Sequence, residues 1–144
     1  MLFRSLRKNI FYIGDSPGFY KFLSPLKNIE LGLSLRKSDV SKEKIILTLK
    51  KFELGNYINK PVGIFSKGML QRLKFAYASL LDWKVGLLDE PLNGLDDEGV
   101  KLFNECIELW IENKQSVLLV THNMDYITHS NYDILYLRNK KIFS

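Results

Sequence analysis

Two short apolar runs constrain the fold of this chain more than any other feature of its 144 residues. The first is Val85–Leu88, in a strand predicted from Trp83 to Leu88 that stops at Asp89-Glu90-Pro91. The second is Val117–Val120, in a strand predicted from Ser116 to Val120 that stops at Thr121-His122. Continuous apolar runs of this length are typical of strands that are buried on both faces, as in parallel sheets. A third run, Asn9–Ile13, predicts another buried strand because it is rich in β-branched and aromatic residues.

Helical patterns lie between these strands. Ser24-Pro25 is typical of a helix start, with serine as the cap and proline in the first turn. A second helix is expected from Ser41 to Phe52, and Gly55-Asn56 is predicted to close it. Ser66 caps a third helix, and a fourth is expected from Asp96 to Asn113. The residues predicted to face inward on the fourth helix are Val100, Phe103, Ile107 and Ile111.

Strands that alternate with helices favour an α/β domain with a mainly parallel sheet. A helical patch at about residues 24–63 is inserted into it, and Tyr132–Leu137 with Lys140–Phe143 predicts a terminal hairpin with Arg138-Asn139 near its turn. The chain length fits one hydrophobic core.

Composition excludes several classes. The single cysteine, Cys106, rules out a disulfide framework and a cysteine-based metal site. No apolar run approaches the roughly 20 residues that a membrane-spanning helix needs. Residues 1–51 hold 11 Lys and Arg against 4 Asp and Glu, but aromatic residues are not interleaved with them as single-strand binders require. No nucleic-acid partner is therefore expected.

Three features carry candidate chemistry at strand ends or helix starts, where α/β sheets place ligands. Asp89 and Glu90 are adjacent carboxylates after a strand, so one can hold Mg²⁺ while the other orients a water. His122 follows the next strand. Ser66-Lys67-Gly68 opens a helix, which is a ready-made anion site. Each also has an ordinary interpretation: an acidic turn, a structural histidine and a plain helix cap.

The order and spacing of four motifs resemble those of the ATP-binding subunit of ABC transporters. These motifs are Phe65–Leu73, Leu87–Pro91, Leu92–Asp96 and Thr121-His122. They look like the signature motif in a Ser-Lys-Gly-Met variant, Walker B with its catalytic glutamate, the D-loop and the switch histidine. The stretch from Ile13 to Tyr20 looks like the Q-loop, with Asp15 where the family usually has Gln or Glu.

The resemblance implies an ABC ATPase domain of the P-loop NTPase fold. Residues 1–144 would be its C-terminal two thirds, with the helical insert at 24–63 and a RecA-like core elsewhere. Two family elements have no counterpart: the nucleotide-stacking aromatic and the Walker A loop, G-x-x-x-x-G-K-[ST]. Gly63 and Gly68 have the glycine spacing, as do Gly94 and Gly99, but Met69-Leu70 and Val100-Lys101 follow them in place of Lys and Ser or Thr. By the family pattern, roughly 60–65 residues would precede Met1.

That difference has two expected consequences. A phosphate loop supplies about four charge-assisted hydrogen bonds of about 1.5 kcal/mol each, so its loss weakens ATP binding by roughly four orders of magnitude. This chain alone is therefore expected neither to bind ATP in its own site nor to hydrolyse it. The sheet is expected to keep an open face and an exposed strand edge.

The resemblance also implies residue roles. Glu90 and His122 would be catalytic, and Asp89 and Asp15 would contact Mg²⁺. The residues that would contact ATP are Ser66, Lys67, Gly68, Met69, Asn93 and Asp96. ATP and Mg²⁺ are expected only where a missing segment or a partner supplies a Walker A loop.

The implied partners are a transmembrane ABC permease subunit, faced by the basic insert, and a second ABC ATPase subunit. The implied location is peripheral, on the cytoplasmic face of the inner or plasma membrane, or on an organelle membrane. An exporter is expected, similar either to the haem exporter of cytochrome c maturation or to ABC-2 drug exporters. The alternative is a degenerate subunit that pairs with an intact ATPase and does not hydrolyse ATP.

Overall fold

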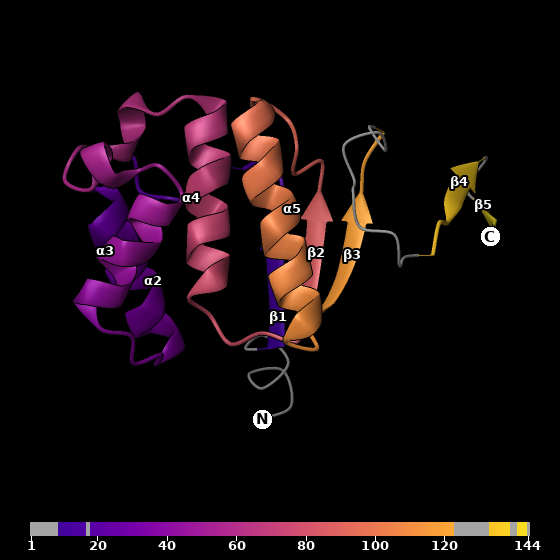
Figure 1. Cartoon of the computed structure of the whole chain (residues 1–144), viewed down its shortest axis with the longest axis horizontal. Helices are drawn as coiled ribbons and strands as arrows, with labels where there is room; N and C mark the ends of the chain where they lie inside the picture. Colours follow the sequence, from indigo (N-terminus) through magenta and orange to yellow (C-terminus); the bar gives the residue numbers. More distant parts are fainter. Residues whose placement is uncertain (1–8, 17, 123–132, 139–140, 144) are drawn as a thin grey trace.

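A parallel three-stranded sheet forms the centre of the chain (Figure 1). The computed structural model describes residues 9–16, 18–122, 133–138 and 141–143. Strands β1 (Ile10–Ile13), β2 (Val85–Asp89) and β3 (Ser116–Val120) pair in that order, all parallel. The alternation of strands and helices therefore gives the predicted α/β fold with a parallel sheet.

The terminal hairpin is confirmed over part of its predicted length. Strand β4 (Tyr136–Arg138) pairs antiparallel with β5 (Lys141–Phe143). The predicted start at Tyr132 and the turn residue Asn139 lie outside the described residues, as do the basic N-terminus and Pro17.

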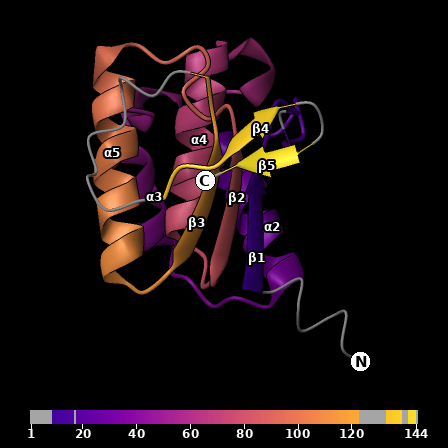
Figure 2. The ribbon, with the colours of Figure 1, turned by 90° about the vertical axis from the view of Figure 1, so that its right-hand side faces the viewer.

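The described residues include four α-helices and two 3₁₀ turns: two of the helices cover one face of the sheet, and the other two lie in the insert (Figure 1). Helices α2 (Pro25–Arg36) and α3 (Lys42–Lys51) build the insert with η1 (Gly55–Tyr57) and η2 (Val62–Ile64). Helices α4 (Lys67–Ser79) and α5 (Asp97–Glu112) lie behind the sheet in Figure 2. The two predicted caps, Ser24 and Ser66, are confirmed, and Ser41 and Asp96, predicted as helix starts, are caps as well. Each of these side chains accepts a hydrogen bond from the backbone N–H three residues on.

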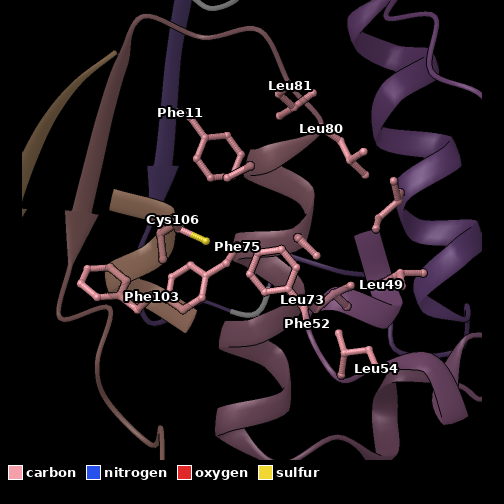
Figure 3. Packing of buried hydrophobic residues seen from close by; sticks show 14 of the residues in the cluster. Phe11, Leu49, Phe52, Leu54, Leu73, Phe75, Leu80, Leu81, Phe103 and Cys106 are labelled. Carbon is pink, nitrogen blue, oxygen red and sulfur yellow. The ribbon is translucent and has the colours of Figure 1, made fainter. Parts of the chain in front are cut away.

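The hydrophobic core fills the space between the sheet and these helices (Figure 3). Phe75 of α4 packs against Phe103 of α5 with ring centroids 5.4 Å apart, and Trp83 meets Trp110 edge to face at 5.2 Å. All four side chains are almost fully buried. Aromatic pairs at these separations add to the free energy of area burial, so this cluster holds α4 and α5 in place beneath the sheet.

The strands are buried on one face only, which corrects the prediction of strands buried on both. Phe11 and Ile13 are buried, whereas Tyr12 is 60 % exposed. On β3, Leu118 and Val120 are 55 % and 56 % exposed. Since the side-chain period of a strand is two, the exposed residues of the strands share one face. The open sheet face expected from the sequence is present in the described part of the chain.

Two local predictions are wrong. On α5, Ile111 is 38 % exposed and Trp110 is the buried residue, because 103, 107 and 110 lie on one helical face while 111 lies beside it. The predicted span of α3 is confirmed, with Ser41 as its N-cap and Phe52 as its C-cap, but the left-handed residue that follows is Glu53 (φ 59°) and not Gly55. Buried Phe52 and Leu54 on either side of Glu53 force the chain to turn there.

Among the described helices, none has the length and apolarity that a membrane span requires.

Candidate functional site at the carboxyl edge of the sheet

The carboxyl ends of β2 and β3 bring the two predicted acidic residues beside the predicted histidine. Asp89 is the last residue of β2 and pairs with Val120, and the Glu90 N–H donates to the Val120 carbonyl at 2.9 Å. This backbone bond continues the ladder for one residue. It places the Glu90 side chain next to the residues that follow β3.

Glu90 makes side-chain contacts through both of its carboxylate oxygens. His122 Nδ1 lies 2.8 Å from Oε1, and Thr121 Oγ1 donates to Oε2 at 3.4 Å. The Glu90 side chain is 28 % exposed and that of His122 is 75 % exposed. The carboxylate is therefore oriented by its neighbours and still open to solvent, as a group that positions a water must be.

The backbone of Glu90 is also unusual. Four described non-glycine residues have positive φ angles, and three of them follow a helix end: Lys37, Glu53 and Lys114. Left-handed residues are common at helix ends. Glu90, with φ 48°, instead follows a strand directly. A left-handed non-glycine residue costs about 1 kcal/mol or more and is found at sites where the surrounding structure enforces it.

The two predicted metal residues lie at the same edge. Asp89 is exposed, and the Tyr12 hydroxyl lies 3.5 Å from its Oδ2. Asp15 is exposed two residues beyond the end of β1. No group of three or more His, Cys, Asp or Glu side chains in the described residues is arranged to hold a metal. Mg²⁺ takes one or two carboxylates and completes its coordination shell with water and phosphate oxygens. Asp89 fits an open site of this kind.

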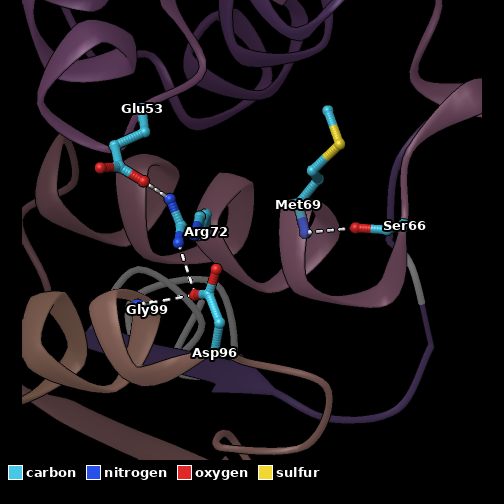
Figure 4. Close-up of polar contacts among 6 residues, drawn as sticks. All are labelled: Glu53, Ser66, Met69, Arg72, Asp96 and Gly99. Carbon is cyan, nitrogen blue, oxygen red and sulfur yellow. Dashed lines mark hydrogen bonds and ion pairs between the residues drawn. The ribbon is translucent and has the colours of Figure 1, made fainter.

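The start of α4 is the predicted anion-binding element. The Ser66 Oγ accepts from the Met69 N–H at 3.2 Å (Figure 4). This cap uses a lone pair of the hydroxyl and leaves its O–H able to donate to an anion. Ser66 and Lys67 are exposed, and Gly68 and Met69 are partly exposed. Because α4 leads back to the amino end of β2, its N-terminus lies at the carboxyl edge of the sheet.

The turn after β2 packs directly on this helix start. A Cβ built at Gly68 would lie 2.5 Å from the Gly94 carbonyl oxygen, and one at Gly94 would lie 2.8 Å from the Cβ of Lys67. Asn93, the predicted neighbour of Gly94 in the site, is exposed. Asp96 follows as the cap of α5, accepting from the Gly99 N–H at 2.9 Å.

Arg72 is a functional candidate that the sequence argument missed. Its guanidinium forms ion pairs with Glu53 of the insert and with Asp96 at 2.6 Å (Figure 4). The hydrogen bond from Arg72, together with the Gly99 N–H, holds the pKa of Asp96 below its usual value. The arginine is 8 % exposed, which is rare for an unpaired charge. Its position inside the signature-like stretch Phe65–Leu73 was the available signal.

Gln71 connects α4 with the acidic turn. Its Nε2 donates to the Pro91 carbonyl at 3.1 Å, one residue beyond Glu90. Its Oε1 is buried without a hydrogen-bond partner in the structure. The structure thus gathers Asp89, Glu90 and His122 at the strand ends, and Ser66–Met69 with Asn93 and Asp96 at the adjoining helix start.

Comparison with known proteins gives this arrangement a context. The family model described as "ABC transporter" matches residues 2–93. The lantibiotic transport ATP-binding protein SrtF of Streptococcus pyogenes is 36 % identical over 126 residues, which are 88 % of this chain and 54 % of that protein. The cytochrome c biogenesis ATP-binding export protein CcmA of Vibrio vulnificus is 29 % identical over 123 residues, covering 85 % of this chain and 60 % of that protein.

Solved structures give the same fold. A dimeric bacterial ABC transporter cassette superposes with a TM-score of 0.75 at 22 % identity, over 88 % of this chain and 57 % of the cassette. An ABC transporter ATP-binding protein from Pyrococcus furiosus superposes with a TM-score of 0.73 at 20 % identity, over 85 % of this chain and 61 % of that protein. The chain spans about half the length of the curated relatives described above.

Proposed function

Because the chain belongs to the ABC transporter family, we propose that it is part of an ATP-binding subunit that drives an exporter by ATP hydrolysis. The observation that carries this proposal is the position of Glu90, bonded through its backbone to Val120 and through its carboxylate to His122. Residues 1–144 correspond in this proposal to the C-terminal two thirds of one ABC ATPase domain.

In the proposed hydrolysis of ATP, each residue at the carboxyl edge of the sheet has a separate role. ATP with Mg²⁺ supplies the transferable phosphoryl group and the charge-neutralising cation. Asp89 would hold the cation, and Asp15, at the exit of β1, would be a second carboxylate for it. Glu90 orients the attacking water and accepts its proton. His122 contacts Oε1 of Glu90 and holds that carboxylate in the orientation that the water requires.

The start of α4 acts on a different nucleotide. Ser66, Lys67, Gly68 and Met69 lie exposed or partly exposed at a helix N-terminus, where phosphate oxygens bind favourably. In the proposed dimer these residues close over ATP that a second ABC ATPase subunit holds. Asn93 and Asp96 lie between this helix start and the carboxylates at the end of β2. Residues 1–144 contain no G-x-x-x-x-G-K-[ST] loop.

The test is Glu90→Gln in the assembled transporter, with Glu98→Gln, an exposed acid in the first turn of α5, as the matched control. We expect turnover to fall about 10²-fold or more for Glu90→Gln, with ATP trapped on the complex. Glu98→Gln should keep the parent rate. Unchanged turnover in Glu90→Gln contradicts the catalytic assignment.

A second function is favoured by the exposed or partly exposed side of the Ser66–Met69 helix start, which can act on a nucleotide that another subunit holds. In this second function the chain hydrolyses no ATP itself, and its residues Ser66–Met69 contact the ATP that is bound to an intact ATPase partner. The two functions predict different results for Glu90→Gln and Lys67→Met when the variant chain is assembled with an intact ATPase partner. If the chain only lends this face, Lys67→Met lowers the turnover of the complex and Glu90→Gln leaves it unchanged.

The permease-binding surface in this proposal lies beside the insert. Tyr20, Phe22 and Ile64 are strongly exposed, Phe22 at 96 %. Backbone bonds from Val62 and Gly63 to the segment that carries Phe22 bring these side chains to one region. An apolar group beside a basic insert fits an amphipathic cytoplasmic helix of the membrane subunit, which would hold this chain at the cytoplasmic face of the membrane.

Phe22→Asp tests this surface. The variant should lose co-purification with the membrane subunit, because a charge would be placed in an apolar contact. The matched control is Leu47→Asp, at an exposed leucine on the outer face of α3, which should still co-purify. Equal retention of both variants would contradict the assignment.

A further inference from the structure

A buried lysine on α4 has no role in the site described above. Lys74 is 8 % exposed and lies among fully buried neighbours on the same helix, including Leu73 and Phe75. Lysine is almost never buried unless its ammonium is paired. The ion pairs of the described residues do not include Lys74. Something other than a direct carboxylate contact must therefore compensate for its burial.

The compensation comes from the exit of β1. The Lys74 Nζ donates to the Gly14 carbonyl oxygen at 2.6 Å, a short, charge-assisted bond. Burial lowers the pKa of Lys74, and the negative charge of Asp15 acts in the opposite direction. Two consecutive residues thus face the ammonium, one with a backbone dipole and the other with a charge.

The bond joins two parts of the proposed site that are far apart in the sequence. Lys74 lies about two turns beyond the start of α4, where Ser66–Met69 lie. Gly14 precedes Asp15, the proposed metal residue, in the segment that leads from β1 to the insert. Since Gln71 and Arg72 also leave α4 to bind Pro91 and Asp96, the helix contacts the β1 exit, the β2 exit and the start of α5 at once.

We propose that Lys74 is a positioning residue that fastens the Gly14–Asp15 backbone to α4, so that Asp15 and the Ser66–Met69 helix start move as one unit. The role of Asp15 in this statement rests on the proposed function, whereas the link between Lys74 and Gly14 belongs to the chain itself. An aliphatic side chain at position 74 would keep the packing of the stem and remove the link.

Hydrogen exchange of the full chain without nucleotide tests the link. Lys74→Met should raise exchange about tenfold in the peptide from Phe11 to Tyr20, with little change in peptides from α5. Lys74→Gln keeps an N–H donor on a shorter stem, so its increase should be smaller. Lys101→Met, at an exposed lysine of α5, is the control. A uniform rise along the chain, or no rise in this peptide, overturns the proposal. If Lys74→Met does not fold, Lys74→Gln decides by the same criteria.

The Mg²⁺ dependence of ATP hydrolysis in the assembled transporter tests the consequence for Asp15. If Asp15→Asn raises the half-saturating Mg²⁺ concentration, Lys74→Met should raise it as well. A rise with Asp15→Asn and none with Lys74→Met overturns the positioning role. If Asp15→Asn changes nothing, the proposed metal role of Asp15 fails, and the exchange experiment still decides on the link.

Discussion

Gly68 packs against the backbone of Gly94, so that a Cβ at position 68 would lie 2.5 Å from the Gly94 carbonyl oxygen. The start of α4 and the turn after β2 therefore meet backbone to backbone. The position of the turn and that of the helix start cannot change independently, because neither has a side chain that could yield.

Gly68→Ala should be destabilising for this reason. Alanine favours a helix over glycine by up to about 1 kcal/mol, but the overlap with Gly94 forces a backbone shift that costs about 1–3 kcal/mol. The measurement is urea unfolding followed by the fluorescence of the two tryptophans, both buried. Gly55→Ala is the control, since its nearest neighbour is the flexible Lys50 side chain at 3.2 Å. Equal midpoints for the two variants would contradict this argument.

Asp96→Asn should lower the free energy of unfolding at neutral pH and change how that free energy depends on pH. Because the folded-state pKa of Asp96 is lowered by Arg72 and Gly99, its contribution to stability is complete above about pH 4, the ordinary carboxyl value. That contribution is lost as pH falls through the lowered pKa. We expect a loss of about 1 kcal/mol at pH 7 that shrinks towards zero in acid. Thermal melts from pH 7 to pH 2 measure it.

Asp97→Asn is the matched control for that series. Asp97 is exposed in the first turn of α5 and does not supply the cap. Its melting temperature should follow the parent at every pH. A difference between Asp96→Asn and the parent that stays constant from pH 7 to pH 2 would contradict the role given to the Asp96 charge.

The features that could be predicted from the sequence are those that depend on residues close together in the chain. Helix starts such as those at Ser66 and Asp96 were found because a helix start is determined by the first few residues. The motifs at the strand ends were found because parallel strands place their carboxyl ends together. Helix α5 was found almost to the residue, yet Ile111 was assigned to the core in place of Trp110, because both spacings fit a helical face locally.

The contacts of α4 could not be predicted in the same way. Arg72 and Lys74 read as surface charges in sequence, and their burial depends on Glu53, Asp96 and Gly14. Those partners are brought close only when the insert, the sheet and α5 have packed. Tertiary contacts of this kind leave no periodic pattern in the chain. The burial of the strands on a single face likewise depends on which elements cover the sheet.

The open sheet face predicts opposite effects for two neighbouring residues. Leu118 is exposed on that face, whereas Leu119 lies partly buried against the core. Leu118→Glu should lower the binding of a hydrophobic dye and reduce self-association, because it interrupts an exposed apolar patch. Its unfolding midpoint should change little. Leu119→Glu should instead lose stability by about 2 kcal/mol or more, since it buries a charge. Similar dye binding by Leu118→Glu and the parent would mean that this face is covered in solution.

The core pair Phe75 and Phe103 predicts where α5 is most sensitive. Phe103 is fully buried, and its ring centroid lies 5.4 Å from that of Phe75. Phe103→Ala should therefore cost about 3–5 kcal/mol, because it removes both the buried area and the aromatic contact and leaves a cavity. Ile111→Ala, two turns further along the same helix at a position that is 38 % exposed, should cost about 1 kcal/mol or less. Urea midpoints compared at equal m-values measure both. A larger loss for Ile111→Ala than for Phe103→Ala would mean that α5 presents a different face to the sheet.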